Sequence, residues 1–320
     1  MTKKELQEAK LKLEQIENID KPDAQFTVPT PDELSVIEEQ ISLEQTVHNV
    51  PSRKYMNLAT LRMIVKRAQS VARIMSFLGE TVGSGFLIKG SEINSKFGDE
   101  SLLMTNAHVL WDTKLGESLD VGFHVPEPHN ARIVFDIEHN DERFEEYKCK
   151  EVVWQSPTLK HNVCLMRLNE PPTHLPTIPI VNSSFVPRIE TVAGRDDGTR
   201  LTMAGYRRDQ NLSTSIHNMN AVLVDIGPRY KDETDPIYLH YRIPKNAEYK
   251  GHALLETENW TLIGIHHAGF NKEKGRPKLN GLSGVNFASE GIDIQSIRRA
   301  IKKDLGGSYP GKFKWWPLGK

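Results

Sequence analysis

The chain has 320 residues, of which 38% are hydrophobic, and it carries 41 Lys and Arg against 42 Asp and Glu. This is the composition of an ordinary globular protein, long enough for one sizeable domain and a smaller element. The balanced charge argues against bulk nucleic-acid binding. No uncharged stretch approaches the roughly 18 residues that a membrane-spanning helix needs, so no membrane partner is expected.

Helical patterns dominate the N-terminal part of the chain. Apolar residues recur at helical spacing within segments 6–16, 34–41 and 56–75, and a proline-containing linker, 21–31, separates the first two. Segment 1–76 is therefore predicted to be a helical module that docks onto a partner or a second copy of the chain. The alternative is that these helices only pack on the body of the protein.

The body of the chain, residues 77–305, shows short β-rich runs punctuated by Gly, Pro and Asn, which is typical of an all-β domain. Its last segment, 292–305, has isoleucines at helical spacing and lysines near its end, which predicts a C-terminal helix. The remaining tail, 306–320, is predicted to be irregular.

The two cysteines and the N-terminal segment help to predict the cellular compartment of the protein. Cys149 and Cys164 are the only cysteines, and they are predicted to be buried thiols and not a disulfide. The charged N-terminus leads into no apolar run, so a cytoplasmic protein is expected. The Cys and His spacing fits no zinc site and there is no phosphate loop, so neither a metal nor a cofactor is predicted.

Four short motifs follow one another in the body. Segment 81–88 has glycines of the kind found where a barrel strand bends. Segment 102–109 is an apolar strand that runs into Thr-Asn-Ala-His-Val, segment 162–168 is an apolar run headed by an asparagine, and segment 261–269 ends in His-His-Ala-Gly.

In order and spacing these motifs resemble trypsin-like and HtrA-like serine peptidases. The resemblance implies a mainly β, double β-barrel fold with an N-terminal helical module and a C-terminal helix. It also implies that His108 occupies the position of the catalytic histidine and Asn162 that of the aspartate which orients it. Segments 260–269 and 286–294 are similar to bacterial trypsin-like domains of conflict and effector-associated systems, which implies a role in antiviral defence.

The chain departs from this family in its catalytic residues. The family's triad combines a hydroxyl nucleophile, an imidazole and a carboxylate. Asn162 replaces the carboxylate, and an asparagine there holds the wrong histidine tautomer, which costs roughly 10⁴ in turnover. Segment 249–255, where the nucleophile is expected, contains no Ser, Thr or Cys.

Three registers place the missing nucleophile differently. If Gly251 is the oxyanion-hole glycine two residues before it, the nucleophile position is Ala253. If 251–255 matches the Gly-Gly-Ala-Leu-Leu that follows the nucleophile in HtrA-like enzymes, the position is Lys250. If the chain is matched without gaps to the hairpin that begins at Trp260, the nucleophile position is Gly251.

Substrate contacts are implied at His266, His267 and Gly269, which follow the hairpin glycine. Viral relatives use a histidine in this place to accept a glutamine or glutamate side chain, so His266 is a candidate for reading an acidic or amide group. A structural role for both histidines is the alternative. A peptide could still bind as an added strand along the barrel edge of a catalytically dead domain.

These observations favour a pseudopeptidase that binds a peptide or protein partner, because two triad residues are lost independently. One alternative is an active site-specific endopeptidase whose serine has been replaced by Ala253. Another is a non-catalytic scaffold led by the N-terminal helices. Within the enzyme reading, a carboxylate from 136–142 could replace the aspartate, or Lys250 could act as a base or amine nucleophile.

Overall fold

The computed structural model describes most of the body of the chain. The described residues are 58–110, 127–136, 144–157, 160–191, 197–206, 212–214, 221–230, 235–242, 250–269 and 275–309. The predicted helices before residue 58, most of the acidic segment 136–142 and the tail after residue 309 lie outside this description.

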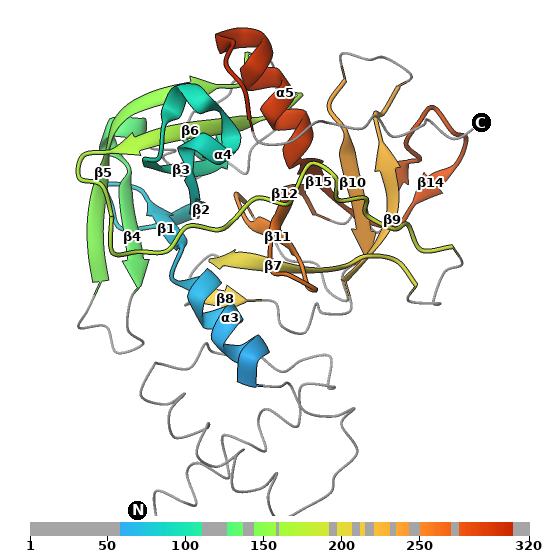
Figure 1. The fold of residues 1–320 in the computed structure, drawn as a ribbon, viewed down its shortest axis with the longest axis horizontal. Coiled ribbons are helices and arrows are strands. Elements are labelled where there is room, and N and C mark those ends of the chain that lie inside the picture. Colours follow the sequence, from blue (N-terminus) through green and yellow to red (C-terminus); the bar gives the residue numbers. More distant parts are fainter. Residues whose placement is uncertain are drawn as a thin grey trace, which may run out of the picture.

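Six antiparallel strands close the first barrel (Figure 1). In the order of their pairing they are β1 (Val71–Met75), β2 (Thr81–Lys89), β3 (Ser101–Asn106), β6 (Val163–Leu168), β5 (Phe144–Gln155) and β4 (Arg132–Asp136). Side chains alternate between two environments along each strand. Leu87 and Leu103 belong to the cluster inside this barrel, whereas Phe86 and Met104 pack with residues of the second barrel.

A second closed ring follows in sequence. It contains β7 (Arg200–Tyr206), β9 (Ala221–Gly227), β10 (Tyr238–Arg242), β15 (Ser289–Asp293), β12 (Leu262–Ala268) and β11 (Ala253–Glu256). Pairing of β11 with β7 closes the ring, and β8 (Leu212–Thr214) adds to the outer side of β7. A separate hairpin joins β13 (Arg276–Pro277) to β14 (Val285–Asn286). The predicted double β-barrel is confirmed.

Helical elements frame the barrels. The longer ones are α3 (Leu58–Ala68) and α5 (Ile294–Leu305), and the short ones are α4 (Gly90–Ile93), η2 (Ser95–Phe97), η3 (Ala107–Val109) and η4 (Pro128–Asn130). The predicted C-terminal helix is confirmed as α5, which begins where the Asp293 side chain accepts a hydrogen bond from the Ser296 N–H at 2.9 Å.

The helix predicted over 56–75 is wrong in its last turns, because α3 ends at Ala68 and 71–75 form β1. The strand pairs on both sides, with β2 and with β4. Its β-branched residues Val71 and Ile74 are buried between these neighbours. Cross-strand pairing therefore overrides the helical spacing of the sequence.

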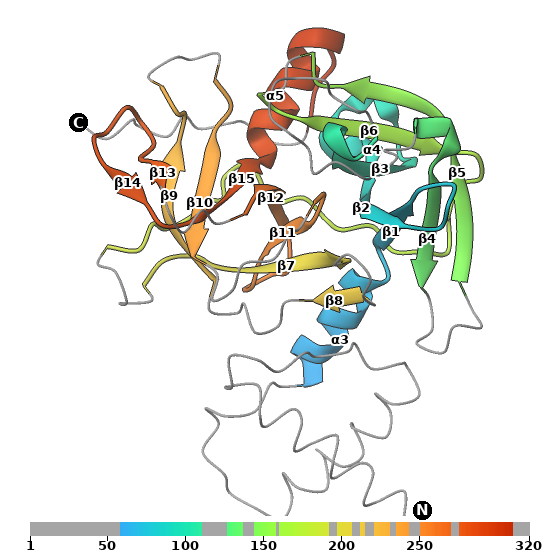
Figure 2. The same cartoon turned by 180° about the vertical axis from the view of Figure 1, so that it is seen from behind.

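The two barrels lie side by side, with α5 packed at their junction, and one of the two apolar clusters contains residues of both barrels (Figures 1 and 2). The connecting segment binds both: the Ile178 N–H donates to the Leu87 carbonyl at 2.8 Å, and the Val181 N–H donates to the Leu262 carbonyl at 3.0 Å. Cys149 and Cys164 are buried free thiols, as predicted. Among the described residues no helix is long and apolar enough to cross a membrane.

Candidate active site

His108 and Asn162 meet at the end of the first barrel. His108 lies in η3, directly after β3, and Asn162 directly precedes β6, while β3 and β6 pair through Asn106 and Val163. The Ala107 N–H donates to the Asn162 carbonyl at 2.9 Å. Asn162 has φ of +46°, a left-handed conformation that Asn and Asp adopt more readily than other non-glycine residues. The strand ends thus place the two side chains together.

The Asn162 amide is held in one orientation. Its Oδ1 accepts a hydrogen bond from the His108 backbone N–H at 3.0 Å, so its Nδ2 faces the other way. That Nδ2 lies 2.5 Å from His108 Nδ1 and 3.4 Å from His267 Nδ1. Because the amide nitrogen is a donor with two hydrogens, both Nδ1 atoms act as acceptors. In neutral His108 the ring proton therefore sits on Nε2.

The surroundings of His108 disfavour its charged form. Burial is the largest cause, followed by the charges of His267 and Lys250, and together they outweigh the hydrogen bond from Asn162 and lower the pKa of His108 to about 4. His108 is thus a neutral imidazole at physiological pH.

The predicted nucleophile segment packs against the first barrel. The Ser84 N–H donates to the Lys250 carbonyl at 2.9 Å, and the Gly251 N–H donates to Asn106 Oδ1 at 2.8 Å. Gly251 has φ of +73°, and a Cβ there would lie 2.0 Å from the Ser84 carbonyl oxygen, so only glycine fits. Its N–H is already engaged, and as an oxyanion donor it would have to give up the bond to Asn106.

The three candidate nucleophile positions differ in exposure. Ala253 is the first residue of β11, is fully buried, and pairs with Ile265 on one side and Ala204 on the other. Gly251 is buried as well, whereas Lys250 is exposed. Among these positions, only Lys250 presents its side chain to solvent.

Two hydroxyl groups near this segment are occupied by the fold. The Ser84 hydroxyl exchanges hydrogen bonds with the backbone of Tyr206, and the Thr105 hydroxyl donates to the Ser84 carbonyl at 2.7 Å. Both residues are fully buried. Within the described part of the chain, the His108 side chain hydrogen-bonds to Asn162 and to no hydroxyl or thiol.

The predicted substrate-binding histidines lie on β12 with different surroundings. His266 is fully buried, and its Nδ1 is hydrogen-bonded to the Tyr241 hydroxyl of β10. Burial and neighbouring charges, led by those of His252 and His267, hold the pKa of His266 well below its usual value. His267 is partly exposed and faces Asn162, so the structure brings it to the predicted triad. Gly269 follows β12, and its carbonyl accepts a hydrogen bond from Arg276 at 2.5 Å.

A buried carboxylate, Glu290 of β15, lies behind His267. It contacts His240 at 3.2 Å and Arg229 at 2.8 Å, while His267 and Arg276 lie at 3.8 and 3.7 Å. Burial on its own would raise the pKa of Glu290, but these donors and positive charges lower it to about 2. Glu290 is therefore ionised and separated from His108 by His267 and Asn162.

The sequence patterns did not indicate several of these residues. Tyr241, Glu290 and the arginines at 229 and 276 come from segments with no recognisable motif, although Tyr241 lies two residues after the core residue Leu239 in β10. A tyrosine at a core-facing position of a strand indicates that its hydroxyl has a buried hydrogen-bond partner.

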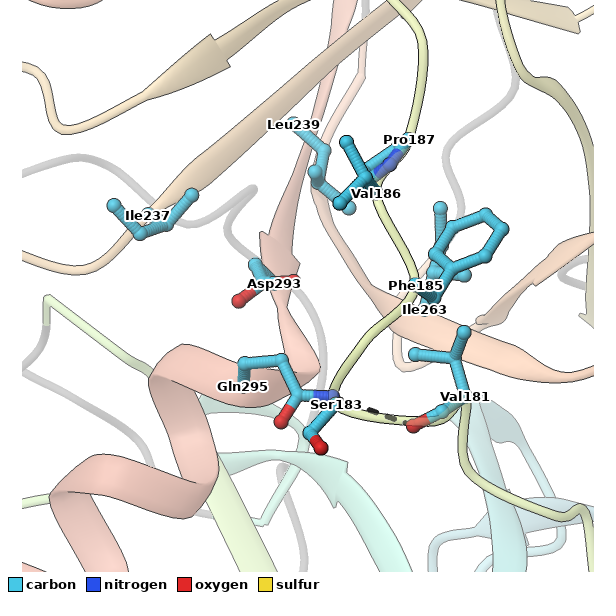
Figure 3. A pocket seen from close by; sticks show the side chains of 10 residues that line it. All are labelled: Val181, Ser183, Phe185, Val186, Pro187, Ile237, Leu239, Ile263, Asp293 and Gln295. Atoms are coloured by element: carbon cyan, nitrogen blue, oxygen red, sulfur yellow. Dashed lines mark hydrogen bonds between the residues drawn. The ribbon is translucent and has the colours of Figure 1, made fainter. Parts of the chain in front are cut away.

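A small hollow lies away from these residues, beside the start of α5 (Figure 3). Apolar side chains including Val181, Phe185 and Ile263 line it, together with Asp293. It contains none of the predicted site residues. The described residues include no group of three or more His, Cys, Asp or Glu that could hold a metal ion.

No family model matches the chain, and no curated protein matches it. Similar solved structures include the VesB protease of Vibrio cholerae, with TM-score 0.46 and 13% identity over 74% of this chain and 64% of that chain. The serine endoprotease of Yersinia pestis has TM-score 0.45 and 17% identity over 81% and 68%. The inactivated protease paralogue S-I1 of the scabies mite has TM-score 0.45 and 11% identity over 75% and 96%.

The chain thus spans less than two thirds of the VesB chain. Because these TM-scores and identities are low, the double-barrel assignment rests on the strand pairing described above and not on the similarity.

Proposed function

We propose that this chain is a trypsin-like serine peptidase homologue that has lost catalysis and acts by binding a peptide or protein partner in its cleft. The observation that carries the proposal is the direction of the Asn162 amide. A general base must offer an unprotonated Nε2 to the nucleophile, with its Nδ1–H bonded to a carboxylate. Asn162 donates a hydrogen bond to Nδ1 instead, so Nε2 of His108 already carries the ring proton.

The exposure of Lys250 supports the register that places it at the nucleophile position. The backbone of 250–251 is hydrogen-bonded to Ser84, within β2, and to Asn106, at the end of β3. A lysine there offers neither the hydroxyl nor the thiol that forms an acyl-enzyme in this family. Two triad positions then carry residues that do not support acyl transfer.

A site that does not hydrolyse peptides can still bind them. In the resembled family a histidine at this position accepts a glutamine or glutamate side chain, and that resemblance alone makes His266 the candidate here, since its ring is buried and hydrogen-bonded to Tyr241. The role in bacterial antiviral defence and the docking function of the N-terminal segment belong to this proposal through sequence resemblance and pattern alone.

Labelling by a fluorophosphonate serine-hydrolase probe tests the proposal. The wild-type chain is expected to stay unlabelled, and the Lys250→Ser/Asn162→Asp double variant is expected to be labelled, since it restores the nucleophile and the carboxylate. Adding His108→Ala to that double variant should abolish labelling.

The matched control for the register is Ala253→Ser/Asn162→Asp, in which the new hydroxyl lies inside β11 and should not react. Labelling or peptide hydrolysis by the wild-type chain would overturn the loss of catalysis. Labelling of the Ala253 variant in place of the Lys250 variant would overturn the register.

A further inference from the structure

His108 and Lys250 present two hydrogen-bond donors where a serine peptidase has its base and its nucleophile. His108 Nε2 carries the ring proton, because Asn162 occupies Nδ1 from the opposite side of the ring. His108 is partly exposed, and Lys250 is exposed. Neither a protonated Nε2 nor an ammonium can accept a hydrogen bond, so the pair calls for a ligand that is purely an acceptor.

Lys250 is held close to His108 by its backbone. Gly251, the next residue, donates to Asn106, which lies two residues before His108. The charge of Lys250 also contributes to the lowered pKa of His108, as expected for neighbouring groups. The described residues provide no ion-pair partner for Lys250.

The described charged residues around His267 are two arginines and one carboxylate, although the whole chain has a net charge of −1. Arg229 and Arg276 share one carboxylate, Glu290, and Lys250 adds a further cation. Arg229 remains 43% exposed in its side chain, so this charge reaches the solvent. A site with excess positive charge attracts anionic segments and disfavours basic ones.

We propose that Lys250 and His108 together bind a carboxylate of an acidic peptide, one oxygen facing each donor. The inference deepens the proposed function and rests on it, because a working general base would have no proton on Nε2. An ionised carboxylate is acceptor-only, and hydrogen bonds to it from an ammonium are among the strong ones in proteins. The carboxylate could be the C-terminus of a peptide or the side chain of Asp or Glu.

Three small probes distinguish these sources. N-acetylglutamine carries a main-chain carboxylate, its isomer N-acetylglutamic acid α-amide carries a side-chain carboxylate, and N-acetylglutamine amide carries none. Each is titrated into the full chain at constant ionic strength while the His108 ring resonances are followed by NMR. We expect saturable shifts with at least one acid, and at least fivefold weaker binding of the neutral diamide. The acid that binds more tightly identifies the source.

Variants test the role of Lys250. Lys250→Met keeps much of the aliphatic stem but removes the charge, and we expect at least a fivefold loss of affinity for the acid. Lys250→Arg should retain binding. Lys303→Met, on the exposed side of α5, is the matched control and should bind like the wild type.

Equal binding of the diamide and both acids, or unchanged affinity in Lys250→Met, would overturn the inference. Absence of any His108 shift with either acid would overturn it too. The labelling experiment distinguishes failure of this inference from failure of the proposed function. If the wild-type chain is not labelled and does not bind the acids, the inference is wrong but the proposed loss of catalysis is still supported.

Discussion

At the scale of single residues, the proposed loss of catalysis depends on an amide nitrogen standing where the resembled family has a carboxylate oxygen. Asn162 keeps the position that the resembled family gives to aspartate, and its left-handed backbone suits either residue. Only the group facing the imidazole differs. An amide donor there fixes the proton of His108 on the wrong nitrogen for catalysis.

Asn162→Asp should therefore raise the pKa of His108 above its wild-type value of about 4. The new carboxylate would accept from Nδ1–H and stabilise the imidazolium, which favours the charged form. An NMR pH titration of the His108 ring protons measures this directly. An unchanged pKa would mean that residue 162 does not govern the imidazole.

Gly251 should tolerate no side chain. Gly251→Ala combines a positive φ with a Cβ 2.0 Å from the Ser84 carbonyl oxygen, and we expect a loss of about 3 kcal/mol in the free energy of unfolding. Gly98→Ala is the control, because its φ of +63° and ψ of −157° are also strained but no atom lies within 4 Å of the new Cβ, and it should cost the smaller amount of roughly 1–2 kcal/mol. Urea unfolding compares the two, and equal losses would contradict the close packing of residues 250–251 on β2.

At the scale of elements, strand pairing decides where the site residues lie. The strands ending near His108 and beginning after Asn162 could be predicted, because each is a continuous apolar run headed or followed by a polar residue. The choice among Lys250, Gly251 and Ala253 could not, since it depends on where β11 begins to pair with β7 and β12. The short strand 71–75 was missed because its apolar spacing also fits a helix.

The start of α5 gives a prediction on pH. Burial among apolar residues raises the pKa of Asp293 to about 6, although it caps the helix. In the folded chain this carboxyl binds its proton more tightly than in the unfolded chain, so its ionised form is unfavourable above pH 6 and the penalty disappears as the pH falls through about 4.

Asp293→Asn keeps a capping oxygen without the charge. We expect it to unfold at a higher temperature than the wild type at pH 7 to 8, and this gain should shrink to nothing at pH 4. Asp293→Ala, which removes the cap, should be less stable than Asp293→Asn throughout. A gain that grows as the pH falls would contradict the raised pKa.

At the scale of the whole molecule, the candidate site combines residues of both barrels. The first barrel supplies His108 and Asn162, and the second supplies Lys250, His267 and the Glu290 cluster. The 3.4 Å separation of Asn162 Nδ2 and His267 Nδ1 joins the two halves. Sequence motifs could place the first half, but Tyr241 and Glu290 reach the site only through the closure of the second ring, which no local spacing encodes.

The tautomer of His108 in the wild-type chain is the most direct test of this account. Long-range ¹H–¹⁵N correlation spectra at pH 7 distinguish a protonated Nε2 from a protonated Nδ1. We predict that the proton resides on Nε2, with Nδ1 accepting from Asn162. A proton on Nδ1 would mean that the side-chain oxygen of Asn162, Oδ1, faces the imidazole. Nε2 would then be free to act as a base, which would contradict the loss of catalysis.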